Sequence, residues 1–242
     1  TIQTGFKTFY CNDCTDKLDY YTSEWKKLGF QPDGIYTGFL SSEKQVDKIL
    51  DFINSFETEN TLVLVDPVMG DGGRTYSLFT DALACKMKKL VTVADVITPN
   101  LTECCILCDV DYCEFIKNAD KPDFMDKIAE LGKNLLNRYG VKIVIITGID
   151  HKDIDGTMYV QNLIASKDEV FSVSCKKIGG SYSGTGDLFA SVMFSGLLRG
   201  DTLRDTVSLA VKFIETSLRD TVALGIDRNE GIEFEKHLKI LL

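Results

Sequence analysis

The chain has 242 residues, of which 44% are hydrophobic, and its 36 acidic and 27 basic residues give a net charge of −9. The length allows one large domain or two small ones, and the hydrophobic fraction is sufficient for a core. The acidic balance, without a cluster of Lys and Arg, argues against nucleic-acid binding, and no apolar run is long enough to span a bilayer. The sequence begins at Thr1 without a basic segment ahead of an apolar one, which predicts no secretory signal and an N-terminus from which residues have been removed.

Eight cysteines are better explained as reduced thiols in a cytoplasm than as a disulfide framework, because the chain is long enough to build a core without one. Two Cys-x-x-Cys pairs, Cys11/Cys14 and Cys105/Cys108, make a zinc site conceivable. The pairs lie far apart in the sequence, however, and the second falls on a predicted helix. We therefore favour thiols that bind no metal.

The first part of the chain predicts a loop followed by alternating helices and strands. These segments are a loop over 1–14, a helix over 16–28 with Leu18, Tyr21, Trp25 and Leu28 on one face, a strand over 35–37, a helix opened by a capping box of Ser42 and Gln45, and a strand over 61–65. The last of these strands is apolar without alternation, which is typical of a strand buried on both faces.

A glycine-rich stretch follows that buried strand. It contains two acids, Asp66 and Asp71, and is closed by Tyr76. Loops at the ends of buried strands are where α/β proteins place their ligands. This stretch is therefore the first candidate for a binding site.

The rest of the chain continues the alternation and adds a hairpin. Its predicted segments are a helix over 81–91, a strand over 93–98, a helix opened by a capping box of Asn100 and Glu103, a helix over 123–139, a strand over 142–147 closed by Gly148, a hairpin over 157–164 and 169–175 that turns at Lys167 and Asp168, a helix over 188–198 and a last helix starting at Asp201. No linker interrupts these segments, so we predict a single domain over 1–242.

Strands that alternate with helices predict an α/β fold, a three-layer sandwich in which a mostly parallel central sheet carries helices on both faces. Right-handed crossovers would bring the carboxyl ends of the strands to one edge of the sheet. Asp66, Thr98 and Thr147 all lie at such ends.

The stretch Ser183-Gly184-Thr185-Gly186-Asp187 opens a helix. A helix start presents unpaired N–H groups and a partial positive charge, which suits a phosphate. Asp187 is explained either as a base that takes a proton from an attacking hydroxyl or as an acid favoured there by the helix dipole. These five residues alone leave both explanations open.

Two acids, Asp66 and Glu103, could serve a divalent cation at this edge, because Mg²⁺ needs only one or two carboxylates beside its waters. Together with Asp187 they suit phosphoryl transfer from a nucleotide, although the sequence contains no P-loop motif. Each residue also has a plain structural explanation. Glu103 could be only the capping partner of Asn100, Asp66 could simply end a strand, and a strand ending in Thr147 and Gly148 is commonplace.

The combination of motifs resembles the pyridoxal kinases of the ribokinase superfamily. The matching segments, in the family's order, are Asp66-Pro67-Val68-Met69-Gly70-Asp71, Gly73-Arg74-Thr75-Tyr76, Ile97-Thr98-Pro99-Asn100-Leu101-Thr102-Glu103, Ile146-Thr147-Gly148 and Gly184-Thr185-Gly186-Asp187. The resemblance implies a ribokinase-like fold and ATP-dependent phosphorylation of a vitamin B6 alcohol, in a cytoplasmic homodimer.

The resemblance also implies a role for each matched residue. Asp187 would deprotonate the 5′-hydroxymethyl group of pyridoxal, pyridoxine or pyridoxamine, while Asp66 and Glu103 would organise Mg²⁺ and the ATP phosphates, with room for a monovalent cation. The remaining implied contacts are the amides of Gly184, Thr185 and Gly186 to the γ-phosphate, Thr98, Thr147 and Gly148 to ATP, Asp71 and Tyr76 in a loop that closes over the nucleotide, and Thr4 and Phe39 to the vitamin.

Two alternatives remain open. Hydroxymethylpyrimidine kinase of thiamine synthesis shares the Asp-Pro-Val-Met and Thr-Pro-Asn segments, but it typically has a cysteine at the position of Asp187 and lacks the continuation to Tyr76. A non-catalytic protein that binds a nucleotide or a vitamin is the second. It is favoured if the strand and helix that precede the position of Thr1 in the family are absent from the molecule.

Overall fold

The computed structural model describes residues 5–77 and 79–242. Thr4, a predicted contact to the vitamin, lies outside the described residues. The chain divides into two compact units, which we describe one at a time. The described part of the first comprises 5–12, Ile149–Asn162 and Val173–Leu242, and the second comprises Asp13–Gly148 and Leu163–Ser172. The single domain over 1–242 stays a prediction.

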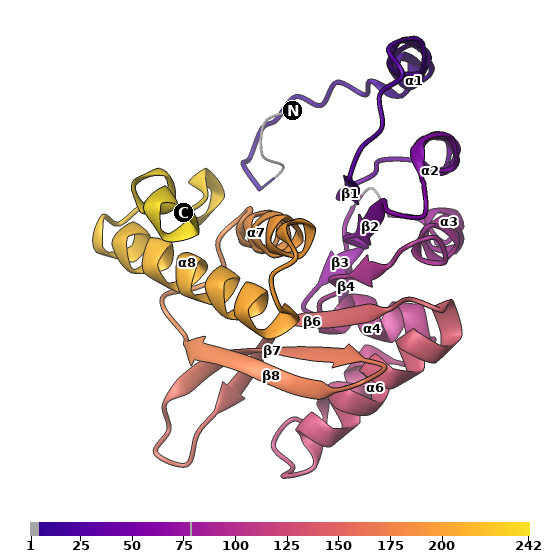
Figure 1. Cartoon of the computed structure of the whole chain (residues 1–242). Coiled ribbons are helices and arrows are strands. Elements are labelled where there is room, and N and C mark those ends of the chain that lie inside the picture. Colours follow the sequence, from indigo (N-terminus) through magenta and orange to yellow (C-terminus); the bar gives the residue numbers. More distant parts are fainter. Residues whose placement is uncertain (1–4, 78) are drawn as a thin grey trace. The chain divides into compact units, whose positions relative to one another are not determined.

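A six-stranded sheet has the order β1-β2-β5-β6-β7-β8 (Figure 1). Its strands are β1 Gly34–Thr37, β2 Leu62–Val65, β5 Val96–Ile97, β6 Ile143–Lys152, β7 Met158–Ser166 and β8 Val170–Lys176. The pairs β1–β2, β2–β5 and β5–β6 are parallel. This pairing confirms the prediction of a mostly parallel sheet, and β7 and β8 confirm the predicted hairpin with its turn at Lys167 and Asp168.

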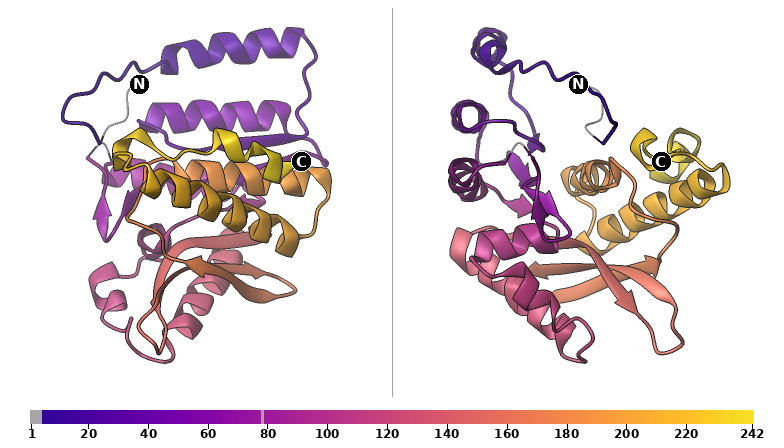
Figure 2. Two further views of the ribbon diagram at one scale, coloured as in Figure 1. Left: turned by 90° about the vertical axis from the view of Figure 1, so that its left-hand side faces the viewer. Right: turned by 180° about the vertical axis from the view of Figure 1, so that it is seen from behind.

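The helices of the second unit connect these strands. They are η1 Thr15–Lys17, α1 Leu18–Lys27, α2 Glu43–Phe56, α3 Asp81–Val91, α4 Leu101–Cys108, α5 Tyr112–Ile116 and α6 Phe124–Tyr139. Helix α2 packs against α3, and α4 packs against α6 (Figure 2). Val46 and Ile53 of α2 are fully buried, as are Val63 and Val65 of β2, which confirms the predicted burial of that strand.

The sequence prediction is wrong in detail at several element boundaries. Strand β5 is shorter than the predicted 93–98, because Val93 and Ala94 still form backbone hydrogen bonds to the last turn of α3. Strand β6 does not end at Gly148 but continues to Lys152. The Ser42 hydroxyl caps α2 as predicted, but the side chain of Gln45 accepts from the N–H of Ser41 rather than from that of Ser42.

Helix α1 differs from an ordinary core helix because none of its residues is buried. Trp25 packs edge-on against Phe52 of α2, with 5.6 Å between the ring centroids. Leu28 directly follows α1, and its side chain is 79% exposed. The predicted apolar face is therefore held to α2 through Trp25 and is not buried.

The first unit contains α7 Thr185–Arg199, α8 Leu203–Ala223, η2 Arg228–Glu230 and η3 Glu235–Leu241. Helices α7 and α8 pack together, and η3 packs on α8. Helix α8 begins two residues after the predicted start at Asp201, because Thr202 provides the cap by accepting from the N–H of Asp205. Val207, Ala210 and Val211 form the buried face of α8.

A methyl group at Gly196 is expected to separate α7 from α8. An added Cβ would lie 2.8 Å from both Cγ2 and Oγ1 of Thr206, which is buried. Overpacking of this kind costs about 1–3 kcal/mol, so Gly196→Ala should lower the free energy of unfolding although alanine is the better helix former. Urea denaturation measures the change, with the exposed Ser195→Ala as a control. An alanine variant as stable as the wild type would contradict this account of the packing.

Candidate active site

The stretch after β2 forms a short hairpin of β3 Gly70–Asp71 and β4 Arg74–Thr75. Met69, which precedes it, is fully buried, and its carbonyl accepts from the N–H of Tyr76 at 3.1 Å. Both predicted nucleotide contacts of this stretch, Asp71 and Tyr76, are exposed. The sequence predicted a loop at this position, whereas the chain forms a hairpin on which Asp71 and Tyr76 are exposed.

Glu103 anchors this hairpin to α4. Its Oε1 accepts from the N–H of Met69 at 3.0 Å, and its Oε2 accepts from the N–H of Asn100 at 2.8 Å. Asn100 accepts in return from the N–H of Glu103 at 3.1 Å, which confirms the predicted capping box. Because each carboxylate oxygen meets a backbone N–H, Glu103 fixes the path of the chain around the hairpin.

Burial, and after it the nearby Asp66 carboxylate, raise the pKa of Glu103 to about 8, against the lowering effect of backbone hydrogen bonds from Met69, Asn100 and Gly70. Only 3% of Glu103 is exposed. The structure therefore brings Asp66 and Glu103 close enough for their charges to interact. A cation bound beside them would favour the ionised form of Glu103.

This raised pKa predicts that the metal-free protein loses stability as the pH rises from about 4.5 to about 8. Over that range the folded chain keeps a proton on Glu103 that the unfolded chain releases, so alkali favours unfolding. Urea denaturation at pH 5.5, 7 and 8.5 measures the slope. Glu103→Gln should remove most of it, and an equal slope in both proteins would show that other groups cause it.

The other predicted ATP contacts of this unit are Thr98, Thr147 and Gly148, of which only Thr98 lies at a strand end. Thr98 follows β5, is 4% exposed, and its hydroxyl has no hydrogen-bond partner among the described residues. A buried hydroxyl without a partner is costly unless a ligand supplies one. Thr147 lies within β6, where it forms a bridge to Asn100, and the exposed Gly148 follows it. Strand register thus places Thr98, Asn100 and Thr147 at one end of the parallel strands.

Asp66 ends β2, is largely buried, and its N–H donates to the carbonyl of Thr37 at 2.8 Å. Within the described residues no group of three or more His, Cys, Asp or Glu side chains could hold a metal ion. Mg²⁺ commonly takes one or two carboxylates and completes its shell with water and phosphate oxygens. The pair Asp66 and Glu103 fits such a site, and their role as metal ligands stays a prediction.

In the first unit, α7 begins with Gly184 at its N-cap, and no side chain of a described residue caps it. The Thr185 hydroxyl donates instead to the carbonyl of Tyr182 at 3.0 Å. Gly186 and Asp187 are exposed in the first helical turn. The N-terminal amides of a helix carry a partial positive charge, so this turn can receive an anion beside an accessible carboxylate.

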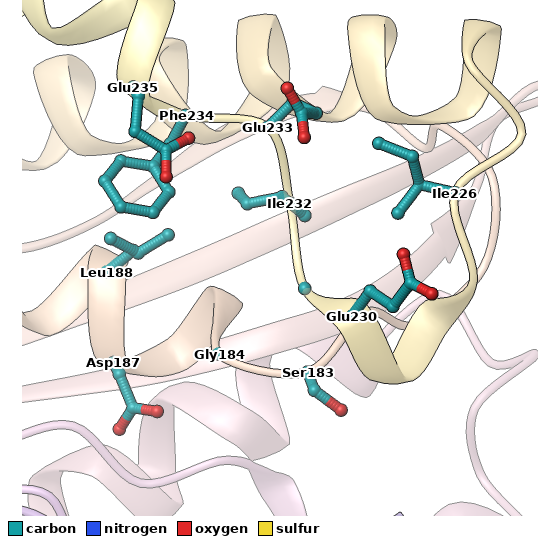
Figure 3. A pocket seen from close by; sticks show the side chains of 11 residues that line it. Ser183, Gly184, Asp187, Leu188, Ile226, Glu230, Ile232, Glu233, Phe234 and Glu235 are labelled. Atoms are coloured by element: carbon teal, nitrogen blue, oxygen red, sulfur yellow. The ribbon is translucent and has the colours of Figure 1, made fainter. Parts of the chain in front are cut away.

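A cavity of about 410 Å³ adjoins this helix start. It lies between the first turn of α7 and the segment 226–235, which contributes Ile232 and Phe234 to its lining. Figure 3 shows the Asp187 side chain pointing away from this segment. Sequence reasoning missed the segment 226–235, because it lacks regular periodicity and reaches α7 only through the tertiary fold.

Two further residues escaped prediction. Thr37 ends β1 beside the end of β2, and its buried hydroxyl lacks a hydrogen-bond partner among the described residues. The position of Thr37 at the end of a strand was the feature of the sequence that could have marked it as a site residue. Thr102 bonds to the hairpin through its hydroxyl, which no local pattern indicates. Phe39, the predicted vitamin contact, follows β1 and is exposed.

Comparison with known proteins identifies the family. The sequence profile of phosphomethylpyrimidine kinase matches residues 26–231. The chain belongs to this family. The family match confirms the resemblance on which the sequence analysis relied, at the level of kinases related to both pyridoxal and hydroxymethylpyrimidine kinases.

Three members of the family illustrate the similarity. A solved structure from Bacteroides thetaiotaomicron, described as a phosphomethylpyrimidine kinase and containing pyridoxal, is 36% identical, with a TM-score of 0.88 over 98% of this chain and 80% of that chain. Pyridoxal kinase PdxY of Pseudomonas aeruginosa is 25% identical over 80% of this chain and 64% of its own length. Hydroxymethylpyrimidine/phosphomethylpyrimidine kinase of Staphylococcus aureus is 27% identical over 81% and 66%.

The structural match confirms the predicted α/β fold, with a mostly parallel sheet flanked by helices. The chain spans about half to two thirds of the length of the curated relatives that it matches. Among its described residues, no helix combines the length and the apolar character needed to cross a membrane.

Proposed function

We propose that this family member is an ATP-dependent kinase that phosphorylates the 5′-hydroxymethyl group of a B6 vitamer. The observation that carries the proposal is the exposed carboxylate of Asp187 in the first turn of a helix whose N-cap is Gly184. This arrangement supplies a base beside an anion site. The relative from Bacteroides thetaiotaomicron, whose structure contains pyridoxal, supports the choice of acceptor.

In the proposed reaction, the acceptor oxygen attacks the γ-phosphorus of ATP while its proton passes to Asp187. The bond between the γ-phosphorus and the bridging oxygen breaks, and ADP leaves with the electron pair. The first amides of α7, at Thr185 and Gly186, would hold the γ-phosphoryl oxygens. Mg²⁺, held by Asp66 and Glu103, would neutralise phosphate charge. Thr98 would offer its buried hydroxyl to the nucleotide.

Hydroxymethylpyrimidine kinase is the second candidate, favoured by the name of the matching family and by the relative from Staphylococcus aureus. The two functions transfer the same phosphoryl group to different aromatic alcohols, so the shared site residues do not separate them. The aspartate at position 187, where that enzyme typically has a cysteine, favours the B6 vitamer. A cytoplasmic location and a homodimer stay predictions.

An ADP-release assay with pyridoxal, pyridoxine, pyridoxamine and hydroxymethylpyrimidine as acceptors tests the proposal. We expect the highest kcat/KM with a B6 vitamer. A higher value with the pyrimidine would replace the proposed function with the second candidate. ATP binding without ADP release on any acceptor would instead indicate a non-catalytic protein.

A further inference from the structure

The hairpin of β3 and β4 has a tight turn of two residues. Its register pairs Asp71 with Arg74, and the two turn residues, Gly72 and Gly73, have φ values of +57° and +77°. Positive φ at both central residues is typical of the type I′ turn, which glycine adopts without a steric penalty. The turn therefore presents Asp71 and Arg74, both exposed, opposite each other on one short hairpin.

Two contacts hold the tip of this hairpin. The N–H of Gly73 donates to Oγ1 of Thr102 at 2.9 Å, and Thr102 itself is 4% exposed in the first turn of α4. On its other side Gly73 abuts the ring of Tyr112, the first residue of α5, because an added Cβ would lie 2.5 Å from Cδ1 of that ring. We call Thr102 and Tyr112 the tip clamp.

The base of the hairpin is held separately. Nδ2 of Asn100 donates to the carbonyl of Gly70 at 2.7 Å, and the N–H of Met69 donates to Glu103. Strands of two residues are too short to be stable without support. The base contacts fix where the hairpin starts, and the tip clamp fixes the direction in which it projects.

We propose that Thr102 and Tyr112 are positioning residues that hold the hairpin where Asp71 and Arg74 meet the triphosphate of the nucleotide. This inference rests on the proposed kinase function. A guanidinium is well suited to phosphate oxygens, and a preformed loop avoids the entropy of ordering it when the ligand binds. The tip clamp acts through the backbone of Gly73.

Amide hydrogen exchange in the substrate-free protein tests the tip clamp without any activity. Thr102→Val removes the acceptor at nearly constant volume, so the Gly73 amide should exchange about fivefold faster, which corresponds to the loss of one hydrogen bond. Thr102→Ser restores the acceptor and should exchange like the wild type. Thr92→Val, which removes an exposed hydroxyl at the end of α3, is the matched control.

Kinetics test the consequence for the nucleotide. Thr102→Val and Tyr112→Leu should each raise KM for ATP about fivefold, while kcat at saturating ATP and KM for the vitamer change less than about twofold. Thr102→Ser should rescue KM. A kcat loss with unchanged KM for ATP would overturn the positioning role.

The exchange result separates this inference from the proposed function. Faster exchange at Gly73 in a protein without kinase activity would support the tip clamp and overturn the kinase assignment. Equal exchange at Gly73 in the wild type and in Thr102→Val would overturn the tip clamp, whatever the activity. Tyr112→Leu provides the same comparison through the ring contact if Thr102→Val does not fold.

Discussion

Asp187→Asn is expected to lower kcat by about 10²- to 10⁴-fold, the usual contribution of a general base. Asparagine has nearly the same size and fits the same exposed position in the first turn of α7, so the backbone amides of that turn remain in place. It cannot accept the proton of the acceptor hydroxyl at neutral pH. The Kd for ATP should therefore change less than about threefold, because the substitution affects the transition state and not the binding of ATP in the ground state. Steady-state kinetics and isothermal titration calorimetry measure the two quantities.

A matched control separates catalysis from a helix-start effect. Asp205 occupies the corresponding first turn of α8, and Asp205→Asn should cost only the few tenths of a kcal/mol typical of a charge near a helix dipole. If Asp187→Asn lowers stability by a similar amount but leaves kcat at the wild-type value, Asp187 is a helix-start residue and not the base.

Glu103→Ala is expected to destabilise the protein by about 2–6 kcal/mol, because one buried and one partly buried N–H group lose their acceptor and each costs about 1–3 kcal/mol. These are the N–H groups of Met69 and Asn100. A loss of this size is a large fraction of the stability of an ordinary domain. The hairpin should also loosen, so KM for ATP should rise together with the loss of stability. Urea denaturation gives the first quantity and steady-state kinetics the second.

Glu103→Gln is the informative comparison for this site. Glutamine keeps an acceptor oxygen for one of the two N–H groups and cannot ionise next to Asp66, whose proximity raises the pKa of Glu103. Its stability loss should therefore be smaller than that of alanine. A Glu103→Ala protein within about 1 kcal/mol of the wild type would contradict the anchoring role, because one unsatisfied buried group alone costs that much.

Elements formed by local signals were predictable from the sequence. The apolar run of β2 and the capping box of Asn100 and Glu103 occur where the pattern places them. The predicted boundaries were wrong where pairing with neighbouring strands determines the end of an element. Strand β6, for example, continues through Gly148. A glycine is a plausible strand end from sequence alone, and only the neighbouring strands reveal that pairing continues.

The residues of the candidate site stay predictions, and their interactions were foreseen only in part. Strand ends and a helix start pointed to Asp66, Glu103 and Asp187, and the capping box predicted the hydrogen bond from the N–H of Asn100 to Glu103. No local pattern indicated that the N–H of Met69 also donates to Glu103. The tip clamp was not predictable, because Thr102 meets Gly73 across 29 residues. Such contacts depend on how α4 packs against the hairpin and leave no periodic trace in the sequence.

The most direct test of the proposed function is product analysis after incubation of the protein with ATP, Mg²⁺ and pyridoxal. We predict pyridoxal 5′-phosphate and ADP in equal amounts, identified by chromatography and mass spectrometry, and neither product above background with Asp187→Asn. ADP without phosphorylated pyridoxal, or equal product from the wild type and Asp187→Asn, would contradict a kinase that uses Asp187 to activate a vitamin alcohol.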